Sequence, residues 1–133
     1  MSRRLLPSFV ATFGIMFLVP FLTYAPLSMI AGLEPPSGVS PAQFMLAVVV
    51  MKVGVALGFV LLYPRTEQPS RRRWLTYAAI WWVMYTLVEI GQAIGPGYGW
   101  LEAIGGIVAE AIYFPLAAWT VERILTRSAA ARA

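Results

Sequence analysis

Four long apolar stretches constrain this chain more than any other feature of its sequence. They cover approximately residues 5–31, 43–63, 74–94 and 101–125. A bilayer core about 30 Å thick is crossed by about 20 apolar residues in a helix, so each stretch is long enough to span it. Because lipid offers no hydrogen-bond partners, such runs cross as helices. The sequence therefore predicts an all-α integral membrane protein with four transmembrane helices, forming a single domain over residues 1–133.

The composition agrees with burial in lipid. Hydrophobic residues make up 59% of the chain and charged residues only 12%, about half the charged fraction of a soluble domain. The chain contains no Cys, His or Asp. Disulfides, thiolate ligands and the usual ligands of haem and zinc are therefore missing, and we expect no metal and no cofactor.

The connections between the stretches are short and rich in helix breakers. Residues 32–42 contain three prolines, and residues 95–99 contain three glycines and a proline. Short connections make neighbouring helices antiparallel. The predicted architecture is an up-down-up-down bundle.

The positions of the arginines predict the orientation. All nine lie before the first stretch, between the second and third, or at the end of the fourth and beyond it: Arg3, Arg4, Arg65, Arg71, Arg72, Arg73, Arg123, Arg127 and Arg132. By the positive-inside rule both termini are cytoplasmic, which predicts a multi-pass protein of the inner (plasma) membrane. The basic run 71–73 fits a topology and lipid-headgroup anchor better than a nucleic-acid site. Tyr63 and Trp74 on the inner side, and Tyr98 and Trp100 on the outer side, are placed for an aromatic belt.

Three charged residues lie deep within the apolar stretches, away from their ends. Lys52 is about 15 Å, Glu110 about 14 Å and Glu89 about 9 Å from the outer end of its stretch, at a rise of 1.5 Å per residue. An ionisable group inside the bilayer costs a few kcal/mol and marks a candidate functional site. These three charges lie at similar depth, in the outer half of the membrane.

Helical spacing brings further polar and aromatic residues to the same depth or the same helix faces. The predicted ligand-binding or ion-binding residues are Glu110, Glu89, Lys52, Gln92, Tyr85, Tyr24, Glu102, Trp81 and Tyr113. Together they suggest a pocket that opens toward the outside. For Trp81, packing in the core or against lipid is favoured over a place in the pocket wall.

Two interpretations of the buried charges remain open. Lys52 and Glu110 form either a structural ion pair that fixes the helix register or part of a functional site. One positive charge faces two carboxylates, and a surplus buried charge is not tolerated unpaired. Either one glutamate is protonated or a cation binds.

Three functions fit this pattern. The first is a small carrier or channel, proton-coupled or cation-coupled, working as a homodimer because four helices hardly enclose a pathway. The second is a non-catalytic membrane subunit or lipid-binding protein of a larger complex. The third is a membrane isomerase or cyclase that uses glutamate acid–base chemistry on a lipid-soluble substrate. Catalytic and nucleotide-binding motifs are absent from the sequence, which favours the non-enzymatic functions. The expected partners are membrane lipids, a small or hydrophobic ligand and a second copy of the chain, but no nucleic acid.

Overall fold

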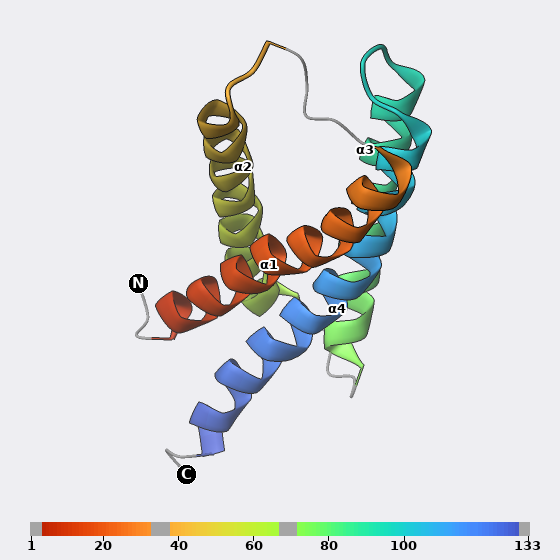
Figure 1. The fold of residues 1–133 in the computed structure, drawn as a ribbon. Helices are drawn as coiled ribbons and strands as arrows, with labels where there is room; N and C mark the ends of the chain where they lie inside the picture. Colours follow the sequence, from red (N-terminus) through yellow and green to blue (C-terminus); the bar gives the residue numbers. More distant parts are fainter. Residues whose placement is uncertain (1–3, 33–37, 67–71, 131–133) are drawn as a thin grey trace.

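The computed structural model describes residues 4–32, 38–66 and 72–130, with side chains as far as Thr126. These residues form four α-helices and no strand (Figure 1). The helices are α1 (Leu5–Ala31), α2 (Pro41–Leu62), α3 (Arg73–Ile94) and α4 (Trp100–Ala130), with a short 3-10 helix, η1 (Tyr63–Arg65), directly after α2. The predicted all-helical class is confirmed, and each helix matches one of the four apolar stretches. The predicted orientation also used Arg3, Arg71 and Arg132, which lie outside the described residues.

The ends of α1 and α2 have local causes in the sequence. At the start of α2 the Ser40 side chain accepts a hydrogen bond from the Gln43 backbone N–H, and the Gln43 side chain accepts one from the Ser40 N–H. This capping box, with Pro41 at the first helical position, starts the helix two residues before the predicted residue 43. The other helix, α1, stays continuous through Pro20 and Pro26 and ends at Gly32, whose φ of +62° favours glycine.

Three helices in the described part of the chain are long and apolar enough to cross a membrane: α1, α2 with η1, and α4. Helix α3 has 22 residues but is not among them. Its sequence carries five Trp and Tyr residues together with Glu89 and Gln92, and these side chains lower its hydropathy. The sequence predicted four spans, and the hydropathy of the helices supports three of them.

Helix α4 forms the centre of the structure. It packs extensively against both α3 and α1, while α2 packs mainly against α1. Figure 1 shows the N-terminal half of α2 standing apart from α3 and α4. Every residue from 41 to 47 is exposed, so among the described residues the first two turns of α2 are little covered by the other helices. Figure 1 also shows the start of α1 and the end of α4 toward the same end of the molecule.

The core is aromatic and lies where the C-terminal end of α2 meets α3 and α4. The Phe59 ring is 4.8 Å from that of Tyr77 and 5.8 Å from that of Phe114, between centroids. The Tyr63 ring lies 4.9 Å from that of Tyr77 in an edge-to-face arrangement, a geometry that aromatic pairs favour. This packing fixes the C-terminal end of α2 in the molecule.

Hydrogen bonds reinforce the aromatic core. The Tyr77 hydroxyl donates to the backbone carbonyl of Phe59 at 2.6 Å. The Tyr63 hydroxyl donates to the Glu122 carboxylate of α4, and the Arg73 guanidinium donates to the Tyr63 carbonyl. Tyr63 is only 1% exposed, so its predicted place in a lipid-facing aromatic belt is wrong. Its ring completes the core because its hydroxyl finds a partner on α4.

The Tyr77 hydrogen bond can be tested by removing one oxygen atom. Tyr77→Phe keeps the ring packing but loses the bond to the Phe59 carbonyl, so we expect the free energy of unfolding to fall by about 1 kcal/mol. Thermal unfolding in detergent measures the change. Thr76→Ala is the matched control, since that hydroxyl is exposed and contacts only a carbonyl of its own helix. Equal stability of the two variants would contradict the assignment.

Candidate functional site

The Lys52 side chain extends from α2 to α4 and meets a tyrosine. Its Nζ atom lies 3.5 Å from the Tyr113 hydroxyl and 4.7 Å from the centre of the Tyr113 ring. Tyr113 itself is buried. Within the described residues Lys52 forms no direct ion pair with a carboxylate, so the simple Lys52–Glu110 pair is not observed. The ammonium is instead stabilised by a hydroxyl and by the face of an aromatic ring.

Glu110 is the most deeply buried charged residue of the site. It is 3% exposed, and its Oε2 atom has no hydrogen-bond partner. Its carboxyl group interacts electrostatically with Glu89 of α3, with Lys52 of α2 and with the Tyr113 hydroxyl one turn along α4. Tyr24 of α1 and Tyr85 of α3 also interact electrostatically with Glu110. Titratable groups from all four helices therefore surround this carboxyl group.

The free oxygen of Glu110 differs from the other buried polar atoms. Across the described ranges, the buried side-chain atoms without a partner are Glu110 Oε2 and the hydroxyl oxygens of Ser8, Thr12 and Thr86. A hydroxyl is neutral, and its burial costs little compared with that of an ionised carboxylate. Of these four atoms, Glu110 Oε2 is therefore the most costly to bury, unless the carboxyl group takes up a proton or pairs with a positive charge.

A second polar group joins α1, α3 and α4 near the turn before α4. The Tyr98 hydroxyl donates to Glu89 Oε2 at 2.6 Å, and the Tyr24 hydroxyl donates to the backbone carbonyl of Glu102 at 2.9 Å. The two hydroxyl oxygens are 3.5 Å apart. Each hydroxyl has one proton and has already donated it. Burial, followed by the hydrogen bond to Glu89, raises the pKa of Tyr98, so Tyr98 remains a donor at neutral pH.

Two adjacent glycines let α4 approach both of its neighbours. A Cβ atom at Gly105 would lie 3.1 Å from Leu27 and 3.4 Å from Tyr24 of α1. At Gly106 it would lie 2.6 Å from the carboxyl carbon of Glu89 on α3. The Glu89 carboxyl group therefore occupies the volume that a side chain at Gly106 would take. Because neither position has a side chain, the polar residues of α1 and α3 can pack directly against α4.

The remaining predicted site residues lie outside these two groups or have a structural task. The Glu102 carboxylate accepts the Gly99 N–H at 2.6 Å and so stabilises the first turn of α4. Trp81 packs among aromatic rings, 5.3 Å from Phe59 between centroids, as a core residue. Gln92 is exposed near the end of α3, and the structure does not bring its side chain to Glu89 or Glu110.

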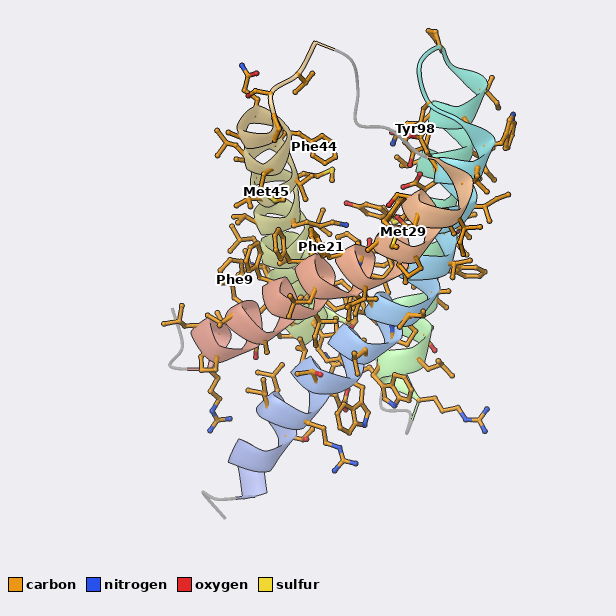
Figure 2. The ribbon with its side chains drawn as sticks, in the orientation of Figure 1. Phe9, Phe21, Met29, Phe44, Met45 and Tyr98 are labelled. Carbon is orange, nitrogen blue, oxygen red and sulfur yellow. The ribbon has the colours of Figure 1, made fainter. Side chains whose placement is uncertain are left out.

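Sequence reasoning missed Tyr98 as a site residue. The sequence predicts an aromatic-belt position for Tyr98, which Figure 2 labels near the turn between α3 and α4. Its hydroxyl instead donates to Glu89 Oε2. A signal was present, because a tight Gly/Pro turn right after α3 folds Tyr98 back onto the last turns of that helix. A buried glutamate within reach of such a turn is expected to accept a hydrogen bond from it.

A shallow apolar groove of about 250 Å³ lies between α3 and α4. Leu75, Trp82, Pro115 and three alanines line it. None of the nine predicted site residues belongs to its wall. The groove offers contacts that suit a lipid chain, and the chemistry of the site lies elsewhere, around Glu110 and Glu89.

The residues of the site are of types that can exchange a proton or pair charges. A buried carboxyl group, a hydrogen-bonded carboxylate and an ammonium group can hold or release one proton or one cation. In the part of the chain that the structure describes, no cluster of three or more His, Cys, Asp or Glu side chains is placed to hold a metal ion.

The fold and site thus define a helical protein with three helices suited to a membrane and a buried polar centre. Comparison with protein-family models, with curated proteins and with solved structures found no match.

The close approach of α3 and α4 is testable at Gly106. In Gly106→Ala the new methyl group collides with the Glu89 carboxyl group, and we expect a loss of about 1–3 kcal/mol in the free energy of unfolding. Gly91→Ala on α3 is the control, because a Cβ there meets nothing within 4 Å and alanine favours the helix. Thermal unfolding in detergent compares the two. A Gly106→Ala protein as stable as Gly91→Ala would refute the contact.

Proposed function

We propose that this chain is a small multi-pass membrane carrier or channel whose buried glutamates take part in proton or cation movement. The observation that carries the proposal is the unpartnered Oε2 atom of Glu110, on a residue 3% exposed at the junction of four helices. A stability role alone would favour a fully satisfied group, since a buried and unpaired carboxylate is costly. Proteins retain such a group when its charge state changes during function.

In this proposal α3 is the fourth span. Its 22 residues correspond to about 33 Å at 1.5 Å per residue, the thickness of a bilayer core. The face of α3 that turns away from α4 is apolar: Ile80, Val83, Met84 and Leu87 are exposed. With Glu89 turned onto Gly106, the lipid would meet an apolar surface. The arginines then place both termini in the cytoplasm, in an up-down-up-down bundle of the inner membrane.

The proposal includes a homodimer. Residues 41–47 at the start of α2 are all exposed within the part of the chain that the structure describes. A second copy that packs against this half would help to enclose the polar centre between eight helices. The same exposed half also supports the alternative function, a membrane subunit of a larger complex, in which another protein covers α2.

Proton movement through Glu110 gives a direct test. In proteoliposomes that contain a pH-sensitive dye, a potassium gradient with valinomycin drives protons inward. We expect the wild type to acidify the interior and Glu110→Gln to be as slow as protein-free vesicles, because glutamine cannot exchange a proton. Glu122→Gln is the matched control. It removes the same charge from the same helix at Tyr63, and we expect it to behave as the wild type.

Two results would contradict the proposed function. The first is a wild type no faster than protein-free vesicles at every pH tested. The second is a Glu110→Gln protein as fast as the wild type. Thermal unfolding of each variant in detergent verifies that the fold is retained.

A further inference from the structure

The groove between α3 and α4 is an apolar surface that the proposed function leaves without a role. Its volume is about 250 Å³, and Leu75, Trp82, Pro115 and three alanines line it. The alanines fill little of the space between two helices that otherwise pack extensively. Small side chains between larger ones therefore leave a hollow along the helix pair.

The groove follows α3 from its beginning to about the middle of a membrane. Helix α3 begins at Arg73, and Trp82 is the lining residue farthest from this end, nine residues on. Nine residues correspond to about 14 Å, close to half of a bilayer core about 30 Å thick. There the Trp82 indole donates to the Ile107 carbonyl of α4 at 3.2 Å and bridges the two helices. The groove thus has the depth of one lipid leaflet.

Arginines lie at the end of the groove where α3 begins. The Leu75 N–H donates to the Arg72 carbonyl at 2.9 Å, so the exposed Arg72 is one turn away from the groove wall. Helix α4 runs in the opposite direction (Figure 1), and Trp119 and Arg123 follow Pro115 at intervals of one turn. The Arg123 guanidinium carbon is 5.2 Å from the centre of the Trp119 ring, and both side chains are exposed.

The charge around this end of the groove is positive. Residues 64–73 contain four arginines and one glutamate. On α4 the Glu122 carboxylate accepts a hydrogen bond from the Tyr63 hydroxyl of η1. An anion at this end would therefore meet a surplus of cations, and a guanidinium group binds phosphate through two parallel hydrogen bonds.

An apolar channel with cations at one end matches the two parts of a phospholipid. The acyl chain needs an apolar wall about one leaflet deep, and the phosphate needs cations at the membrane surface. A helix from a second copy of the chain would fit the apolar wall but would have no use for the arginines. A free phosphate would use the arginines but not the apolar wall.

From these observations we propose that the groove binds one anionic phospholipid. Its acyl chain lies along the wall between Leu75 and Trp82, and its phosphate binds Arg72 and Arg123. The bound lipid covers the hollow and joins α3 to α4 at their arginine-bearing end. The proposal depends on α3 crossing the membrane, which belongs to the proposed function, and is independent of proton movement through Glu110.

Quenching of tryptophan fluorescence by brominated lipids tests the proposal, because Trp82 lies in the groove wall. The purified protein in detergent is titrated with dibrominated phosphatidylglycerol or with dibrominated phosphatidylcholine. The contribution of Trp82 is the difference between the wild type and Trp82→Phe. We expect the anionic lipid to quench Trp82 at a concentration at least about tenfold lower than the zwitterionic lipid, the combined effect of two arginines.

Two pairs of variants locate the lipid. Arg72→Gln should need about fivefold more phosphatidylglycerol and the same amount of phosphatidylcholine. Its control, Arg65→Gln, removes the same charge from η1 and should bind as the wild type does. Ala79→Leu fills the groove and should lose the quenching at lipid concentrations that half-quench the wild type. Its control, Ala25→Leu, changes an exposed alanine of α1 and should keep the quenching.

Several outcomes would overturn the proposal. These are equal quenching by the two lipids, the same effect of Arg65→Gln and Arg72→Gln, and wild-type binding by Ala79→Leu. Absence of Trp82 quenching would mean that a second copy covers the groove, and displacement of the lipid by an equal concentration of inorganic phosphate would mean a free-anion site. Either result contradicts a lipid site. The proton flux that depends on Glu110 is measured separately, so the carrier can stand when the lipid site fails.

Discussion

The structure depends on the close approach of α1 and α3 to opposite sides of α4, which two adjacent glycines allow. At Gly105 the neighbour is Tyr24, and at Gly106 it is the carboxyl group of Glu89. Inside a membrane the hydrophobic effect does not drive helices together. Their association therefore depends on such small residues and on hydrogen bonds between helices. The same two positions therefore hold the helices together and bring polar groups from α1 and α3 toward Glu110.

Helix α2 is bound to the rest of the molecule in a different way. At its C-terminal end, Tyr63 bonds to α4 and Phe59 accepts a hydrogen bond from α3. Toward its N-terminal end it lacks such contacts, and residues 41–47 are exposed. The buried charge centre lies at the level where the packed C-terminal part of α2 ends and its exposed N-terminal part begins. A carboxyl group at such a boundary experiences a change of surroundings whenever the exposed part moves.

The helices could be predicted from the sequence because their cause is local. Apolar runs of bilayer length predicted all four, but the predicted start of α2 at residue 43 missed the capping pair Ser40 and Gln43. The detailed contacts could not be predicted in the same way. Tyr98 turns inward because of the geometry of a tight turn, and Gln92 is exposed although it shares a helix face with Glu89. Likewise the Lys52 ammonium is bonded to a tyrosine because a long side chain selects among several partners, a choice that spacing does not encode.

The capping box at the start of α2 has a consequence for mechanics. A helix end normally leaves backbone N–H groups that need partners, and inside a membrane these come from neighbouring segments. Ser40 and Gln43 satisfy two of these donors from within the helix itself. The end of α2 therefore needs no docking site to remain folded. Any displacement of this end would leave both hydrogen bonds intact, because their donors and acceptors belong to the same first turn.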